Sequence, residues 1–137
     1  MHIPSALKFA ALTLAAVVAL LVATVAVFVY FLDPLCVNEP IFSLDSPGGV
    51  YQAVLFQRNC GATTPYSLHV SVLAYGAELP DEPGNVLIFR DQNLTPSLHW
   101  NSPSNLMIEY PAYPDISHVQ GAPAGISVQY RALIGQR

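Results

Sequence analysis

The sequence predicts a mainly β protein, with an N-terminal transmembrane helix followed by a small antiparallel β-sheet or sandwich domain of about five or six strands. Three observations lead to this fold class: an uninterrupted apolar run over residues 9–32, a two-residue alternation of apolar and polar side chains in later segments, and prolines placed between those segments. With 137 residues the chain has room for one domain, because domains usually hold about 100 to 150 residues.

The apolar run is long enough to cross a bilayer. Residues 9–32 contain no charged residue, amide, glycine or proline. As a helix the run would span about 36 Å, whereas a hydrocarbon core is about 30 Å thick. A cleaved signal peptide has a shorter apolar stretch before a small-residue cleavage site, and here the run continues beyond Ala26. We therefore expect residues 9–32 to be a transmembrane anchor, which Asp33-Pro34 ends.

Charges on either side of the anchor predict its orientation. Lys8 precedes the anchor, whereas Asp33, Glu39 and Asp45 follow it. Because cationic residues are retained on the cytoplasmic side, residues 1–8 are expected to form a cytoplasmic tail. Residues 33–137 would then lie on the outer face of the membrane.

The two cysteines, Cys36 and Cys60, both follow the anchor. An even pair outside the cytoplasm is commonly a disulfide, and the loop that it closes would stabilise the fold by about 3.5 kcal/mol on the chain-entropy model. The alternative is two buried free thiols, since cysteine also behaves as a small hydrophobic residue.

Beyond the anchor, residues 33–49 are rich in Pro, Gly, Ser and Asp, and they are interpreted as an irregular stalk that ends in a turn at residues 46–49. Residues 50–137 are expected to form the β domain. Alternation predicts half-buried strands over residues 66–75, 105–110 and 126–132, whereas residues 50–57 and 86–90 are apolar on both faces and would be covered strands. In the first of these segments the residues expected to share the inward face are Tyr66, Leu68, Val70, Val72 and Ala74, and those expected to face outward are Ser67, His69 and Ser71.

Proline positions bracket these segments independently of the alternation, because proline is excluded from central strands. No stretch beyond residue 33 has helical periodicity over three turns. Parallel strands need long crossovers, which are usually helical, so antiparallel connectivity is expected. The prolines between the segments are Pro80, Pro83, Pro96, Pro103, Pro111, Pro114 and Pro123.

The segment from Cys36 carries a resemblance to a known group of proteins. C-V-N-E, followed by S-P-G-G-V-Y-Q-A-V-L-F-Q-R-N-C-G-A-T-T-P-Y-S-L-H-V-S-V-L over residues 46–73, resembles uncharacterised small bacterial proteins, membrane-anchored or secreted, with a Cys-Gly-Ala-Thr-Thr signature. The resemblance implies a bacterial setting, in which the segment beyond the anchor would lie on the periplasmic or extracellular side of the inner membrane. It implies no particular activity.

The signature loop, residues 59–65, is a candidate binding loop. Gly61, Thr63, Thr64 and the following Tyr66 are the candidate residues, since glycine amides and threonine hydroxyls present donors to a small ligand or carbohydrate. The structural alternative is that the loop uses these groups to satisfy its own backbone.

Motifs for catalysis and metal binding are lacking in the sequence. His69, His99 and His118 are isolated, with His69 expected on the polar face of its strand and His99 in a loop. No nucleophile elbow, paired carboxylates or phosphate-binding glycine loop occurs. We therefore expect no metal, no cofactor and no catalytic residue. The alternative is a hydrolase whose site is assembled from these histidines by tertiary contacts.

Two further features bear on partners. Four arginines against nine acidic residues follow the anchor, a balance of −5, and such a surface disfavours nucleic-acid binding. Trp100, Tyr110 and Tyr113 lie in a proline-rich stretch and are candidates for an exposed interaction surface. Core packing and loop rigidity explain these residues equally well. The leading hypothesis is a non-catalytic, membrane-tethered module that contacts the bilayer through residues 9–32 and an unknown protein partner in an envelope assembly.

Overall fold

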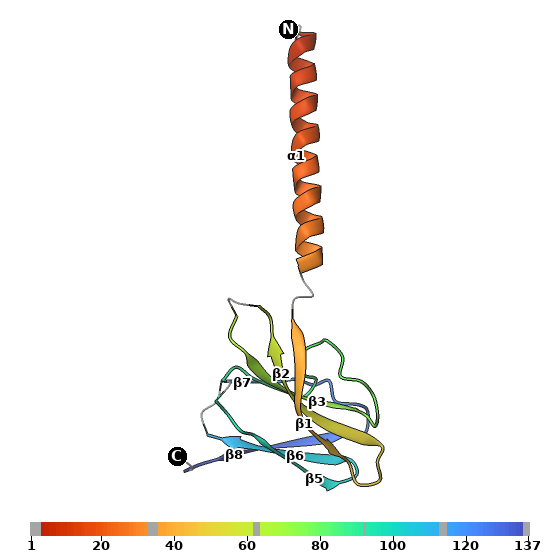
Figure 1. The fold of residues 1–137 in the computed structure, drawn as a ribbon, viewed down its shortest axis with the longest axis vertical. Coiled ribbons are helices and arrows are strands. Elements are labelled where there is room, and N and C mark those ends of the chain that lie inside the picture. The colour runs from red at the N-terminus through yellow and green to blue at the C-terminus, as the bar shows by residue number, and fades with distance from the viewer. Residues whose placement is uncertain (1–3, 33–35, 62–63, 92, 113–114, 136–137) are drawn as a thin grey trace. The chain divides into compact units, whose positions relative to one another are not determined.

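The computed structural model describes residues 4–32, 36–61, 64–91, 93–112 and 115–135. The chain divides into two compact units, Met1–Leu35 and Cys36–Arg137. The first unit holds a single helix and the second, called the β domain below, holds eight strands in its described residues (Figure 1). The predicted fold class, an apolar helix followed by a mainly β domain, is confirmed.

Helix α1 (Ser5–Leu32) is apolar around its whole circumference. Its segment Ser5–Phe31 is long and apolar enough to cross a membrane, and none of its most apolar window is buried against protein. The Thr13 and Thr24 hydroxyls donate to backbone carbonyls of the preceding turn, including that of Leu20 at 2.8 Å, so they need no water. The helix therefore fits a transmembrane or signal anchor.

The strands of the β domain form two sheets. Sheet A has the order β1-β2-β3-β4-β7, and sheet B has the order β5-β6-β8. All neighbours in sheet A are antiparallel. The strands are β1 (Val37–Asp45), β2 (Tyr51–Asn59), β3 (Ser67–Ala74), β4 (Leu87–Phe89), β5 (Ser97–Ser102), β6 (Asn105–Pro111), β7 (Ile116–His118) and β8 (Ser127–Leu133).

The core lies between the two sheets. Alternate residues of β2, β3 and β4 meet those of β5 and β6 in one buried cluster, and residues of β8 pack against it. The inward positions that alternation predicts are therefore confirmed in β6 and in the middle of β3. They are wrong at Tyr66, which is 41 % exposed just before β3, and at Ala74, which is exposed at the end of β3. The central members of the cluster are Leu55, Val70, Leu87, Phe89, Trp100, Leu106 and Ile108.

The segment expected to be an irregular stalk contains a strand, so that prediction is wrong for residues 37–45. β1 pairs with β2 from Val37↔Asn59 to Asp45↔Gln52, with an irregularity between Pro40 and Phe42. Most of β1 is exposed because it is the edge strand, where proline is tolerated. The turn expected at residues 46–49 is present, and Gly48 and Gly49 adopt positive φ there.

The expectation of purely antiparallel pairing is wrong at one place. β6 and β8 are parallel, with Ile108 opposite Tyr130. The crossover that such a pair requires is residues 112–126, and it holds no helix in its described part. Instead the chain leaves sheet B, adds β7 to the edge of sheet A beside β4, and returns.

The outer face of sheet A, which faces away from sheet B, is covered over β2 and β3. Val54, Phe56, His69 and Ser71 are buried there although they alternate with the inward residues. The loop between β3 and β4 folds back on this pair of strands. Its Asn85 side chain accepts from the Val72 amide and donates to the Val72 carbonyl, both at 2.8 Å. The β2–β3 pair is thus buried on both sides.

Candidate functional site

The disulfide predicted between Cys36 and Cys60 is present. Cys36 immediately precedes β1 and Cys60 immediately follows β2, and the adjacent residues Val37 and Asn59 face each other across the ladder. The bond therefore closes the end of the β1–β2 pair at which the signature loop begins.

Two hydrogen bonds form within the described part of the signature loop. The Asn59 side chain accepts from the Gly61 amide at 3.0 Å, and the Gly61 carbonyl accepts from the Thr64 amide at 3.2 Å. Gly61 has a φ of 104°, which favours glycine. These contacts support the structural alternative for Gly61. Thr63 lies outside the described residues.

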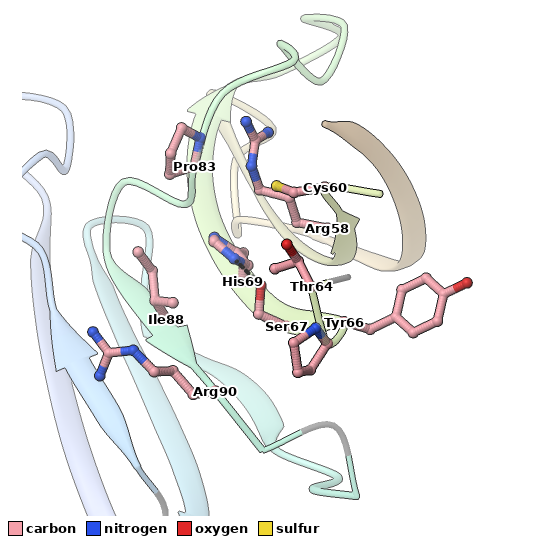
Figure 2. A pocket seen from close by; sticks show the side chains of 10 residues that line it. Arg58, Cys60, Thr64, Tyr66, Ser67, His69, Pro83, Ile88 and Arg90 are labelled. Carbon is pink, nitrogen blue, oxygen red and sulfur yellow. Dashed lines mark hydrogen bonds between the residues drawn. The ribbon is translucent and has the colours of Figure 1, made fainter. Parts of the chain in front are cut away.

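Two adjoining hollows bring the other candidate loop residues together. Gly61, Thr64 and Tyr66 line one of about 340 Å³. Thr64 and Tyr66 also line a second, of about 360 Å³, with Arg58 and His69, and we call this second hollow the Arg58 cavity. Figure 2 shows Thr64 and His69 near its centre, with Arg58 to one side. The cavity lies on the outer face of sheet A, because Arg58 and His69 alternate with core residues.

His69 is buried, which corrects the expectation of a solvated side chain on a polar face. The residue is only 4 % exposed, and its ring stacks on that of Phe56 with centroids 5.3 Å apart. The Gly84 amide donates to Nδ1 at 2.8 Å, and Nε2 lies 2.8 Å from the Ser67 hydroxyl. Because Nδ1 accepts, the neutral ring carries its proton on Nε2 and donates it to Ser67.

This environment lowers the pKa of His69 from 6.5 to about 4, first through burial and then through the positive charge of Arg58. Between these two values the unfolded chain binds a proton that the folded chain excludes. Lowering the pH from about 6.5 to about 4 is therefore expected to reduce the free energy of unfolding by up to about 3 kcal/mol. Denaturation of the wild type at a series of pH values measures the loss.

The matched control for that prediction is His69→Gln, which has no titrating ring at this position and retains the other histidines. The difference in stability between the two proteins should change with pH inside this window and be constant above it. A constant difference throughout the window would contradict the buried, neutral state of His69.

The loop that covers His69 is held by residues that the sequence analysis did not select. The Asn38 side chain donates to the Pro80 and Glu82 carbonyls at 2.8 and 2.7 Å, and its oxygen accepts from Arg58 at 2.8 Å. A Cβ on Gly84 would lie 2.8 Å from the Val70 carbonyl, so only glycine fits there. A single asparagine in an edge strand and a single glycine in a loop carry too little sequence signal to reveal such contacts.

The candidate aromatic surface is not exposed at two of its three positions. Trp100 and Tyr110 are 7 % and 6 % exposed, and both belong to the core. The Trp100 indole donates to the Leu44 carbonyl at 3.0 Å, which ties sheet B to the edge of sheet A. The expectation of an interaction surface is wrong for these two residues, and Tyr113 lies outside the described residues.

The remaining histidines have other surroundings. His99 is exposed on β5 rather than in a loop, and His118 is exposed on β7, with its ring 4.4 Å from that of Tyr130. Among the described residues no three His, Cys, Asp or Glu side chains are grouped so that they would hold a metal ion. The structure therefore does not bring His69, His99 and His118 together into one cluster in this part of the chain.

Comparison of the chain with protein-family models, with curated proteins and with solved structures finds no match.

Proposed function

We propose that this protein is a single-pass, membrane-tethered and non-catalytic β module on the outer side of a bacterial cytoplasmic membrane, where it serves as an interaction or accessory component of an envelope assembly. One observation carries the proposal: a helix with its apolar surface fully exposed precedes a unit that has its own buried core. Such a helix is stable where lipid covers it, and the β domain then needs no further support.

Charge and redox state support the proposed orientation. Lys8 is the only lysine of the chain and stands at the start of the apolar helix, whereas all nine acidic residues follow the helix. The disulfide between Cys36 and Cys60 fits an oxidising compartment such as the periplasm or the cell exterior.

The edge strand β1 supports a role in protein contacts. Val37, Ile41 and Phe42 are 54 %, 55 % and 45 % exposed, so three apolar side chains of one strand face solvent in the β domain. Exposed apolar residues on a sheet edge favour association with another polypeptide.

Photo-crosslinking in intact cells tests this role. A photoreactive residue at Ile41 is expected to give a discrete crosslinked product, because that side chain lies on the proposed contact strand. The matched control is the same residue at Gln129, which is exposed on β8 in the other sheet. Equal crosslinking at both positions, or none at Ile41, would contradict a partner bound at β1.

A second candidate function is a small-ligand-binding module. The Arg58 cavity favours it, since a hollow of about 360 Å³ lined by Thr64, Tyr66 and His69 is within the usual size range of ligand pockets. This function is compatible with the membrane tether and does not depend on it.

A further inference from the structure

The strand register places two arginines on either side of a serine at the Arg58 cavity. Arg58 on β2 lies opposite Ser67 on β3. Leu68 lies opposite Phe89 on β4, and because these two strands are antiparallel, the residue before Leu68, Ser67, lies opposite the residue after Phe89, Arg90. Neighbouring strands lie about 4.8 Å apart, which puts the three side chains in one lateral row on the outer face of sheet A. All three line the cavity (Figure 2).

The hydrogen bonds of His69 leave the Ser67 hydroxyl as a donor. Because the Gly84 amide occupies Nδ1, the ring donates from Nε2 to the Ser67 oxygen. The Ser67 proton must therefore point elsewhere, and within the described part of the chain it has no acceptor. A hydroxyl fixed in this way presents a proton to whatever enters the cavity.

Arg58 lies beside this hydroxyl and has no ion-pair partner among the described residues. Its guanidinium donates to the neutral side-chain oxygen of Asn38, and among the described residues no carboxylate lies within ion-pair distance of it. By contrast, Arg90 is paired with Asp115 at 2.8 Å. A partly buried arginine with a neutral partner retains donors and charge for an anion.

The rest of the lining is largely apolar. Ile88 and Pro83 lie on one side of the cavity, whereas Tyr66 lies at its outer edge with the ring directed away from His69. Apolar walls with a few convergent polar groups are typical of sites for small organic molecules.

We propose that the Arg58 cavity binds a small organic anion, with its carboxylate accepting from Arg58, Ser67 and Thr64 and its apolar body lying against Ile88 and Pro83. The inference deepens the second candidate function and rests on it, because it names the chemical class of the ligand. It does not depend on which side of a membrane the domain occupies.

The test is a ligand titration of the full-length protein in detergent micelles, followed by ¹H–¹⁵N NMR at the Ser67 and Gly84 amides. The probe is benzoate, and benzamide is the uncharged analogue of the same shape. Benzoate is expected to shift both amides, with an affinity at least about tenfold higher than that of benzamide, because only the carboxylate can form charge-assisted hydrogen bonds.

Two variants and one control locate the site. Arg58→Gln should weaken benzoate binding about tenfold, and Thr64→Val, at an exposed position that keeps the backbone bond to Gly61, should weaken it severalfold. Arg131→Gln removes an arginine paired with Glu109 on sheet B and should leave the affinity unchanged. Thermal unfolding of each variant establishes whether it is folded. If Arg58→Gln does not fold, Thr64→Val still tests the site.

The outcomes separate this inference from the function on which it rests. Equal affinities for benzoate and benzamide, both weakened by Thr64→Val, would retain a ligand-binding module and overturn the anionic class. Shifts by neither probe, or shifts unaffected by both cavity variants, would overturn the cavity as a binding site for such molecules.

Discussion

Replacing Phe89 by alanine is expected to lower the free energy of unfolding of the β domain by about 4 kcal/mol, the largest effect of any single substitution considered for this protein. The Phe89 side chain is fully buried on β4, and its ring meets that of Tyr110 on β6 edge to face with centroids 5.6 Å apart. It therefore joins the two sheets, and its removal costs both the transfer free energy and a cavity. Chemical denaturation of the full-length protein measures the loss.

The matched control is Phe42→Ala, the same chemical change on the exposed edge strand. Phe42 is 45 % exposed, so its truncation should cost about 1 kcal/mol or less. Similar costs at the two positions would mean that Phe89 does not lie between two packed sheets.

The second large effect is expected for the double variant Cys36→Ser/Cys60→Ser. The cysteines are separated by 24 positions, and loss of this cross-link should destabilise the β domain by about 3.5 kcal/mol on the chain-entropy model. For a domain of this size such a loss lowers the melting temperature by roughly 15 to 25 °C. Thermal unfolding monitored by circular dichroism gives the shift.

Chemical reduction supplies an internal control for this variant. The wild type treated with reductant should melt close to the double variant, and reductant should have no effect on the variant itself. A double variant that melts with the oxidised wild type would show that the bond contributes little to the stability of the domain.

The parts of the fold that follow from the sequence are those in which every second side chain belongs to the core between the two sheets. In β3 and β6 the inward residues, such as Val70 and Ile108, alternate with others, and this period is visible without a structure. The covered strands around Leu55 and Leu87 were also predictable, since residues on both faces are apolar. Burial decides the composition of these strands, so composition reveals them.

The parts that do not follow are those set by tertiary contacts. β1 is exposed on most of its length and contains Pro40, so neither alternation nor composition marks it as a strand. The parallel pairing of β6 with β8 depends on β7, a strand of three residues that joins the other sheet. Whether such a short segment forms a strand depends on the strand beside which it lies, and its own sequence carries little signal.

Tertiary contacts also decide which of the predicted residues meet at the candidate site. Of the predicted loop residues, Thr64 and Tyr66 do line the Arg58 cavity, because the signature loop begins where β2 ends. The alternation of β3 predicts that His69 faces outward. It is buried because the loop that Asn38 holds covers that position. Arg58 lies beside Ser67 because of the register in which β2 and β3 pair. The sequence of one strand alone does not specify that register.

Site-resolved amine labelling in intact cells tests the central claim, that the apolar helix crosses a membrane and holds the β domain on its outer side. Lys8 is the only lysine of the chain, so a membrane-impermeant amine reagent has one side-chain target, which mass spectrometry identifies. A second protein, Lys8→Arg/Gln129→Lys, moves that target to an exposed position on β8. We expect Lys8 to react only after the cells are permeabilised, and the lysine at position 129 to react in intact cells. The reverse pattern, or recovery of the protein outside the membrane fraction, would contradict the account.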